Sequence, residues 1–298
     1  MLSSLPWRLR TKTLAAGRIP LLMGVVNVTP DSFSDGGRFF EPAAAVEHGL
    51  RLAAEGADLL DVGGQSTRPG AMPITAEEEL RRVLPVIIAL RKQTDLPLSI
   101  DTSSAKVAAE CLAAGVEVVN DVTALTSDDR LLALAAESGC GVCAMHIQGT
   151  PQTMQIDPRY GDVVEDVFAW LAARRDALLT AGIAQDRIAM DPGIGFGKTA
   201  AHNLAILNHL SRYRALECPL LIGISRKAFL GHLIGDPAAD RTAGTIGAAL
   251  AAARQGVEIL RVHDVAAVRQ ALVVFDAVGG FAAEPTLTST RILGILAP

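Results

Sequence analysis

Eight short segments rich in Val, Ile and Leu recur along this chain of 298 residues, and stretches with many Ala and Leu residues separate them. Short apolar runs with many β-branched residues are typical of parallel strands that are covered on both faces. We therefore predict strands over residues 21–28, 58–62, 98–100, 117–120, 141–145, 187–190, 220–224 and 259–262.

The intervening stretches have the composition of helices, and we predict helices that include 43–54, 76–92, 105–114, 163–181 and 243–254. Thr75 and Glu78 have the spacing of a capping box at the start of the second helix. Glycines precede several strands and could end the helices before them: Gly56, Gly115, Gly139, Gly182 and Gly256.

Strand and helix alternation fits either a (β/α)8 TIM barrel or an open doubly wound sheet. Each predicted strand runs into a polar or glycine-rich cluster; these begin at Asn27, Gly63, Asp101, Asn120, His146, Asp191, Ser225 and His263. A barrel builds its site from many strand ends, whereas an open sheet concentrates it at one or two positions. We predict an α/β protein with one barrel domain over 21–279, an N-terminal lead-in over 1–20 and a C-terminal tail over 280–298.

Composition narrows the class of protein. The chain has 27 Lys and Arg against 32 Asp and Glu, and this acidic balance argues against a general nucleic-acid binder. Four cysteines are too few for a disulfide scaffold, and no apolar run reaches the length of a membrane span. The basic N-terminus contains Pro6 and Pro20, so we interpret it as a lead-in rather than a transit peptide. We expect a soluble, cytoplasmic protein.

Three motifs do not meet the requirements of the sites they suggest. Residues 193–199 (GIGFGKT) lack the spacing of a phosphate-binding P-loop and of a dinucleotide fingerprint. Cys140, Cys143 and His146 have no second ligand pair for zinc, so we expect buried thiols. The acidic residues 77–79 are interpreted as a solvated helix start.

Two loops after strands are richer in functional groups than a connecting loop requires. Residues 27–37 (NVTPDSFSDGG) place Phe33 among hydroxyls and carboxylates, which suits a lid over a substrate. Residues 61–70 (DVGGQSTRPG) offer hydroxyls and a guanidinium that could bind a phosphate or an aromatic acid.

Together with three further strings, these loops resemble the dihydropteroate synthase family. The strings are 23–37 (MGVVNVTPDSFSDGG), 61–70, 191–198 (DPGIGFGK), 223–227 (GISRK) and 261–264 (RVHD). They cover about 21–279 in order, and the long strings are specific to this family among pterin-binding barrels. Gln65 stands where many relatives have Glu, and it keeps the hydrogen-bonding reach.

The resemblance implies a transferase of folate synthesis. This enzyme condenses (7,8-dihydropterin-6-yl)methyl diphosphate with 4-aminobenzoate and releases diphosphate. A pterin edge presents donors and acceptors, for which Asp101, Asn120 and Asp191 are suitable partners. Met145 and Phe196 would pack on the ring faces. Departure of diphosphate leaves a carbocation that the charges of Asp101 and Asp191 would stabilise.

The leaving group needs cations and donors. Arg261 and His263 are two residues apart, so on one strand their side chains would point to the same side. Asn27 and a Mg2+ ion would complete the diphosphate site.

The second substrate needs positioning more than deprotonation. Lys227 would contact the pterin and border the aminobenzoate, while Ser225 and the following helix start could bind its carboxylate. In the two loops, the residues expected to close around the ring are Phe33, Thr67, Arg68 and Pro69. The resemblance also implies a homodimer and a target of sulfonamides.

Two other functions are compatible with a pterin-binding barrel. A methyltetrahydrofolate-dependent methyltransferase would share the Asp and Asn residues but has no need of the Asn27 loop or of Arg261 and His263. A catalytically inert, pterin-binding paralogue would be expected to lose Lys227, Arg261 or a loop motif, and all are present.

Overall fold

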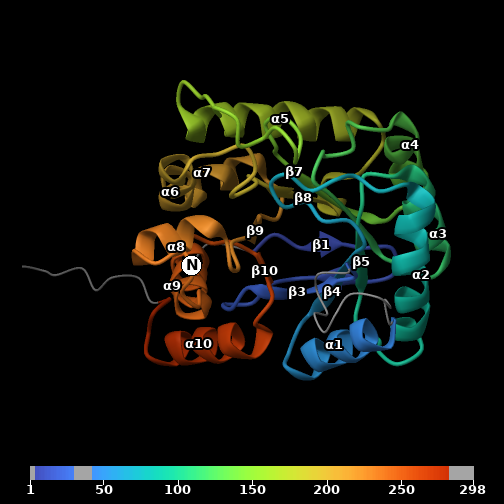
Figure 1. Ribbon diagram of the computed structural model, residues 1–298, viewed down its shortest axis with the longest axis horizontal. Coiled ribbons are helices and arrows are strands. Elements are labelled where there is room, and N and C mark those ends of the chain that lie inside the picture. Colours follow the sequence, from blue (N-terminus) through green and yellow to red (C-terminus); the bar gives the residue numbers. More distant parts are fainter. Residues whose placement is uncertain (1–3, 30–41, 282–298) are drawn as a thin grey trace, which may run out of the picture.

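The computed structural model describes residues 4–29 and 42–281, and eight parallel strands form its centre (Figure 1). Neighbouring strands follow the order β8-β7-β6-β5-β4-β3-β10-β9, and a bridge between Met190 and Leu220 joins the two ends of this order. The strands are β3 (Leu21–Asn27), β4 (Leu59–Gly63), β5 (Leu98–Asp101), β6 (Val118–Asp121), β7 (Gly141–Met145), β8 (Ile188–Asp191), β9 (Leu221–Gly223) and β10 (Ile259–Val262). The predicted (β/α)8 barrel is confirmed, and no strand boundary differs by more than one residue from its prediction.

Helices surround the strands and cover their outer side (Figure 1). They are α1 (Pro42–Ala54), α2 (Ala76–Arg91), α3 (Ala105–Ala113), α4 (Asp129–Ser138), α5 (Val163–Thr180), α6 (Ala200–Asn208), α7 (Leu210–Tyr213), α8 (Ala228–Ile234), α9 (Thr242–Arg254) and α10 (Val265–Ala277). Thr75 caps α2, because its hydroxyl accepts the Glu78 N–H at 3.2 Å. The predicted capping box is only half formed, since the Glu78 carboxylate pairs with Arg81 and Arg82 instead of the Thr75 backbone. The glycines predicted to end helices all have positive φ, for which Gly139 at the end of α4 is an example (φ 67°).

The N-terminal lead-in closes the amino end of the barrel. Strands β1 (Trp7–Arg8) and β2 (Thr13–Leu14) form a hairpin, and Trp7 and Leu9 are buried against the first residues of the barrel strands. The Trp7 indole N–H also donates to the Arg187 carbonyl at 2.9 Å. A hairpin at this end leaves the carboxyl ends of the strands for a site.

Two predictions about polar residues have different outcomes. All four cysteines are buried and unpaired, and these include Cys140 and Cys143, for which buried thiols were predicted. The interpretation of residues 77–79 as a solvated helix start is wrong for Glu79, which is buried beneath Gly64 with 4% of its surface exposed. The periodicity of α2 accounts for this, because Val83 and Val86 continue the same inward-facing side.

Within 4–29 and 42–281, no helix is long and apolar enough to cross a membrane.

Candidate active site

Charged side chains from neighbouring strands meet inside the carboxyl end of the barrel. The register pairs Asp101 of β5 with Asn120 of β6, so the two lie at one level. Asp61 of β4 is completely buried and accepts the Asn120 amide at 3.0 Å. Asp61 also accepts Arg261 Nε at 2.6 Å, and Arg261 Nη2 donates to Asp101 at 2.9 Å. Four strands thus contribute to one continuous polar network.

The network holds a guanidinium between two carboxylates. Burial raises the pKa of Asp101 to about 7, although the charge of Arg261 opposes that rise. Burial disfavours the Arg261 cation, but the pKa of Arg261 is raised because Asp61 and Asp101 outweigh burial. Arg261 therefore stays charged, and for Asp101 the effect of burial on the carboxyl outweighs the opposing effect of that charge.

Asp191 ends β8 and opens the loop that leads to α6. Burial raises the pKa of Asp191 to about 6, opposed by the Gly193 N–H and by the charges of Lys227, Lys198 and Arg261. The Gly193 N–H donates to Asp191 Oδ1 at 2.7 Å. Gly193 has a φ of 70° and lies against the His146 carbonyl, where a side chain would collide with it. This contact fixes the start of the loop against the end of β7.

Phe196 and Lys227 lie together beside this loop. Lys227 Nζ is 4.1 Å from the centre of the Phe196 ring, a cation–π distance. Burial lowers the pKa of Lys227 to about 8, and Asp191 opposes that fall. Met145, which ends β7, is 5% exposed and pairs with Asp191 in the sheet. A flat heterocycle would find an apolar ring, a thioether and two carboxylates here.

Arg261 and His263 have different partners in this structure. Strand β10 ends at Val262, and His263 follows it. His263 Nδ1 lies 3.1 Å from Ser225 Oγ, while Arg261 reaches Asp61 and Asp101. Burial and the charge of Arg261 lower the pKa of His263 to about 3, so its imidazole is neutral at physiological pH. Ser225 Oγ also accepts the His263 backbone N–H at 3.2 Å, and α8 begins three residues later, at Ala228.

A cavity lies beside residues 66–72, part of one of the two loops predicted to close around the aminobenzoate. Thr67 is half-buried, whereas Arg68 and Pro69 are exposed. A cavity of about 350 Å³ is lined by Thr29, Ser66, Arg68, Pro69, Gly70, Ala71, Met72, Ile74 and Arg82. Asn27 is half-buried at the end of β3. Phe33 lies outside the described residues.

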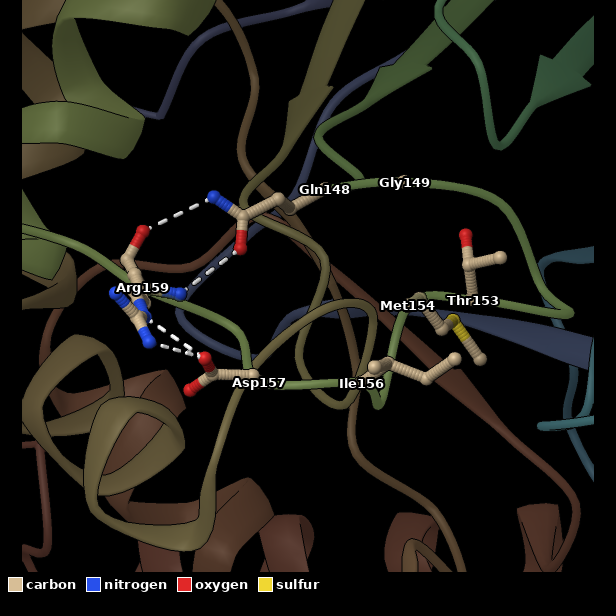
Figure 2. Close-up of a pocket in the computed structure, with 7 residues that line it drawn as sticks. All are labelled: Gln148, Gly149, Thr153, Met154, Ile156, Asp157 and Arg159. Atoms are coloured by element: carbon tan, nitrogen blue, oxygen red, sulfur yellow. Dashed lines mark hydrogen bonds and ion pairs between the residues drawn. The ribbon is translucent and has the colours of Figure 1, made fainter.

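The loop between β7 and α5 contacts two other loops of the site, residues 193–197 and residues 66–72. Gln155 Nε2 donates to the Gly195 carbonyl at 2.9 Å, and Gln152 Nε2 donates to the Ala71 carbonyl at 2.7 Å. A cavity of about 460 Å³ lies along this loop, where Gln148 and Arg159 exchange two hydrogen bonds (Figure 2). Contacts with both the 193–197 loop and the 66–72 loop make this segment a bridge between them.

Sequence reasoning missed two parts of the site. Asp61 was considered only as the start of a loop motif, although a carboxylate between Leu60 and Val62 inside an apolar strand is a signal of a buried polar role. Lys198 and His146 form a buried contact at 2.9 Å that no local pattern predicts.

Comparisons with known proteins agree with this geometry. A family model described as pterin binding enzyme matches residues 23–263. The dihydropteroate synthase of Neisseria meningitidis serogroup B is 46% identical over 266 residues, which cover 87% of this chain and 93% of the relative. The Escherichia coli K12 dihydropteroate synthase is 42% identical over 258 residues, which cover 87% of this chain and 91% of the relative.

Solved structures give the same result. Xanthomonas albilineans dihydropteroate synthase with 4-aminobenzoic acid superposes with a TM-score of 0.86 at 48% identity, covering 93% of this chain and 98% of that one. The same enzyme in complex with 7,8-dihydropteroate has a TM-score of 0.81 at 45% identity, with 92% and 98% covered. Yersinia pestis dihydropteroate synthase with a sulfonamide drug has a TM-score of 0.86 at 42% identity, with 93% and 100% covered.

Proposed function

This chain belongs to the dihydropteroate synthases of the pterin-binding enzyme family, and on that basis we propose how its residues perform the reaction. The substrates are (7,8-dihydropterin-6-yl)methyl diphosphate and 4-aminobenzoate, and the products are 7,8-dihydropteroate and diphosphate. The observation that carries the assignment of roles is the network of Asp61, Asn120, Arg261 and Asp101 at the carboxyl ends of four strands.

The pterin binds between the loop after β8 and the ends of β5 and β6. Asp101, Asn120 and Asp191 supply carboxylate and amide partners for its polar edge, which suits a heterocycle with fixed donors and acceptors. Phe196 and Met145 pack on the ring faces, and Lys227 donates from above Phe196. Binding favours the ionised forms of both aspartates, because an ionised carboxylate is an acceptor on both oxygens and forms the stronger, charge-assisted hydrogen bonds with the N–H groups of the pterin.

The reaction proceeds by a carbocation-like displacement. The C–O bond to diphosphate breaks and its electron pair leaves with the diphosphate, so positive charge develops on the pterin methylene. Asp101 and Asp191 stabilise that charge in a site where water is scarce. The amine of 4-aminobenzoate then forms the new C–N bond and loses a proton.

The diphosphate binds to Arg261, His263 and Asn27. Arg261 uses its Nε and one Nη2 hydrogen for Asp61 and Asp101, and a guanidinium has further N–H groups for an anion. His263 is neutral and so contributes a hydrogen bond rather than a charge. Arg261 thereby connects the leaving-group site to the pterin pocket.

Mg2+ fits the donors at the end of β3. Asn27 offers one neutral carboxamide oxygen at the end of β3, a strand that pairs with β10, which carries Arg261. Mg2+ is commonly bound by one or two protein oxygens together with substrate phosphates rather than by an all-protein cage. Among the described residues no cluster of three His, Cys, Asp or Glu side chains could form such a cage. When bound with the diphosphate, the ion would neutralise charge on the leaving group.

The aminobenzoate binds beside Lys227, with its carboxylate near Ser225 and its ring under Thr67, Arg68 and Pro69. Support comes from the cavity of about 350 Å³ that Arg68 and Pro69 line. A sulfonamide is expected to compete for this position, since it resembles 4-aminobenzoate in shape and charge.

A homodimer is proposed through the outer faces of α8 and α10. These helices flank α9 in Figure 1. Leu233 and Ile234 of α8, Val273 and Val274 of α10, and Val278 directly after α10 are exposed apolar side chains. Large exposed apolar patches typically mark interfaces. Val274→Lys should shift the sedimentation coefficient to that of a monomer, whereas Ile88→Lys on α2, another exposed apolar position, should not.

Four buried, unpaired thiols support a reducing compartment such as the cytoplasm.

A coupled diphosphate-release assay with both substrates tests the function. Turnover that requires 4-aminobenzoate supports a dihydropteroate synthase. Pterin binding without diphosphate release would instead identify an inert paralogue. Methyl transfer from a methylated folate would identify the methyltransferase.

A further inference from the structure

Lys198 is a buried cation that the proposed reaction does not use. It follows the 193–197 loop and is 2% exposed. Its Nζ lies 2.9 Å from His146 Nδ1 and donates to the Phe196 carbonyl at 3.0 Å. Within the described part of the chain it forms no ion pair with a carboxylate. A buried ammonium with only neutral hydrogen-bond partners is costly, so its position here calls for an explanation.

The surroundings of Lys198 tie it to the pterin-facing loop. The imidazole of His146 is neutral, because burial and the charge of Lys198 lower its pKa to about 3, so Nδ1 can accept the ammonium. Tyr160 donates from its hydroxyl to the Gly197 carbonyl at 2.7 Å, and its ring centre lies 6.0 Å from Lys198 Nζ. Two side chains therefore hold two successive carbonyls of the same loop, and one of the two is charged.

Resting on the proposed function, we infer that Lys198 is a positioning residue of the pterin pocket. Its ammonium holds the Phe196 carbonyl by a hydrogen bond and places a buried positive charge on the side of the loop where Asp191 lies. Phe196 in turn lies under Lys227, so a displaced Phe196 carbonyl would disturb both the ring that packs on the pterin and the cation above it.

The effect of the Lys198 charge on Asp191 follows from position, because Lys198 Nζ contacts the His146 ring and the His146 backbone N–H donates to the Asp191 carbonyl at 2.9 Å. Three cations face the Asp191 carboxylate. These are Lys227, Lys198 and Arg261, and each lowers the pKa of Asp191 against the effect of burial. Burial lowers the pKa of Lys198 to about 7, which is still above the value of about 6 for Asp191. At pH 6, near the midpoint of Asp191, Lys198 is therefore still mostly protonated, and its charge is lost as the pH rises past about 7. Its removal would leave Asp191 with two facing cations and a higher pKa.

Lys198→Met and Tyr160→Phe form a matched pair of variants. Both remove a side-chain donor to a loop carbonyl, but only the first removes a charge. We expect Lys198→Met to raise the pH midpoint of Asp191, read from its 13C-carboxyl resonance, by about half a unit to one unit. Tyr160→Phe should leave that midpoint unchanged. Asp191→Asn identifies the resonance. If Lys198→Met does not fold, Lys198→Gln removes the charge and retains an N–H donor.

Pterin binding provides the second measurement. At pH 6, affinity for a pterin without diphosphate should fall about two- to fivefold in Lys198→Met, because the ionised fraction of Asp191 falls by that factor, and recover in Lys198→Arg. The Asp101 carboxyl, which faces Arg261, should keep its midpoint. Equal Asp191 midpoints in the wild type and in the folded Lys198 variants would overturn the inference. A wild-type protein that binds no pterin would instead contradict the proposed function, because the carboxyl titration needs no ligand.

Discussion

Arg261 lies between Asp61 and Asp101, and its Nε and Nη2 atoms donate to the two carboxylates at 2.6 Å and 2.9 Å. Asp61 accepts from Asn120 with the same oxygen that binds Arg261. Arg261 was expected from sequence only at the diphosphate. Its observed partners make it a structural member of the pterin pocket as well, and this changes what its substitution should do.

Arg261→Lys should lower kcat/KM by about 30- to 1,000-fold, because an ammonium cannot make the paired contacts of a guanidinium. Steady-state kinetics of diphosphate release measure the loss. Affinity for a pterin without diphosphate should fall too, since Asp61 and Asp101 lose a shared partner. Unchanged affinity for that bare pterin would restrict Arg261 to the leaving group.

Asp101→Asn should lower kcat by ~10²-fold or more, because the amide keeps the shape of the carboxyl but removes a charge that stabilises the developing cation. The variant also removes one of the two carboxylates of Arg261, so its thermal unfolding should be compared with that of the wild type. A change in KM alone would show that Asp101 binds substrate and transition state equally.

Pterin binding should weaken as the pH falls through 7 and then 6, because Asp101 and Asp191 lose their charges at about those values.

The free energy of unfolding should depend on pH in the opposite direction. A raised carboxyl pKa means that the folded state binds a proton more tightly than the unfolded chain, so these groups destabilise the protein as pH rises from about 4 to 7. Asp191→Asn should therefore raise the Tm at pH 8 while abolishing pterin binding. An unchanged Tm at that pH would contradict the burial of the charge.

The strand ends could be predicted because parallel strands that are buried on both faces leave an unbroken apolar signal. Asp101, Asn120 and Asp191 each follow such a run, and the barrel then places them at one end. The position of each of these residues could be predicted from the local sequence, because it depends only on the strand that the residue ends.

Pairings across the barrel could not be predicted in the same way. Asp61 and Arg261 are 200 residues apart in sequence, and Lys198 and His146 are 52 apart. Which inward-facing side chains meet depends on the stagger between strands and on the local path of the loops, neither of which leaves a periodic trace. The hairpin of residues 7–14 was missed because each of its strands has only two residues.

Removal of Mg2+ by a chelator should abolish turnover and leave the binding of a non-phosphorylated pterin intact. The metal would be held by Asn27 and the diphosphate, so a pterin without diphosphate does not need it. Isothermal titration calorimetry with and without chelator measures the binding. Equal loss of binding and turnover would mean that the metal has a structural role or binds elsewhere.

Gln152→Ala should raise the KM for 4-aminobenzoate by about 2- to 10-fold, the range expected for one lost hydrogen bond. Gln152 donates to the Ala71 carbonyl at 2.7 Å, next to the loop that carries Thr67, Arg68 and Pro69. Within the described residues, the side chain of Gln152 forms no hydrogen bond with the 193–197 loop. Pterin affinity should stay near that of the wild type.

Gln155→Ala is the matched control, because the same exposed segment contributes both glutamines and Gln155 donates to the Gly195 carbonyl at 2.9 Å. This variant should weaken pterin binding and leave the KM for 4-aminobenzoate nearly unchanged. If Gln152→Ala changed only the KM for 4-aminobenzoate and Gln155→Ala only the pterin affinity, the β7–α5 loop would position the two substrate loops separately. If both variants changed the same constant, the loop would act as a single unit, and the division of the site between its two glutamines would be wrong.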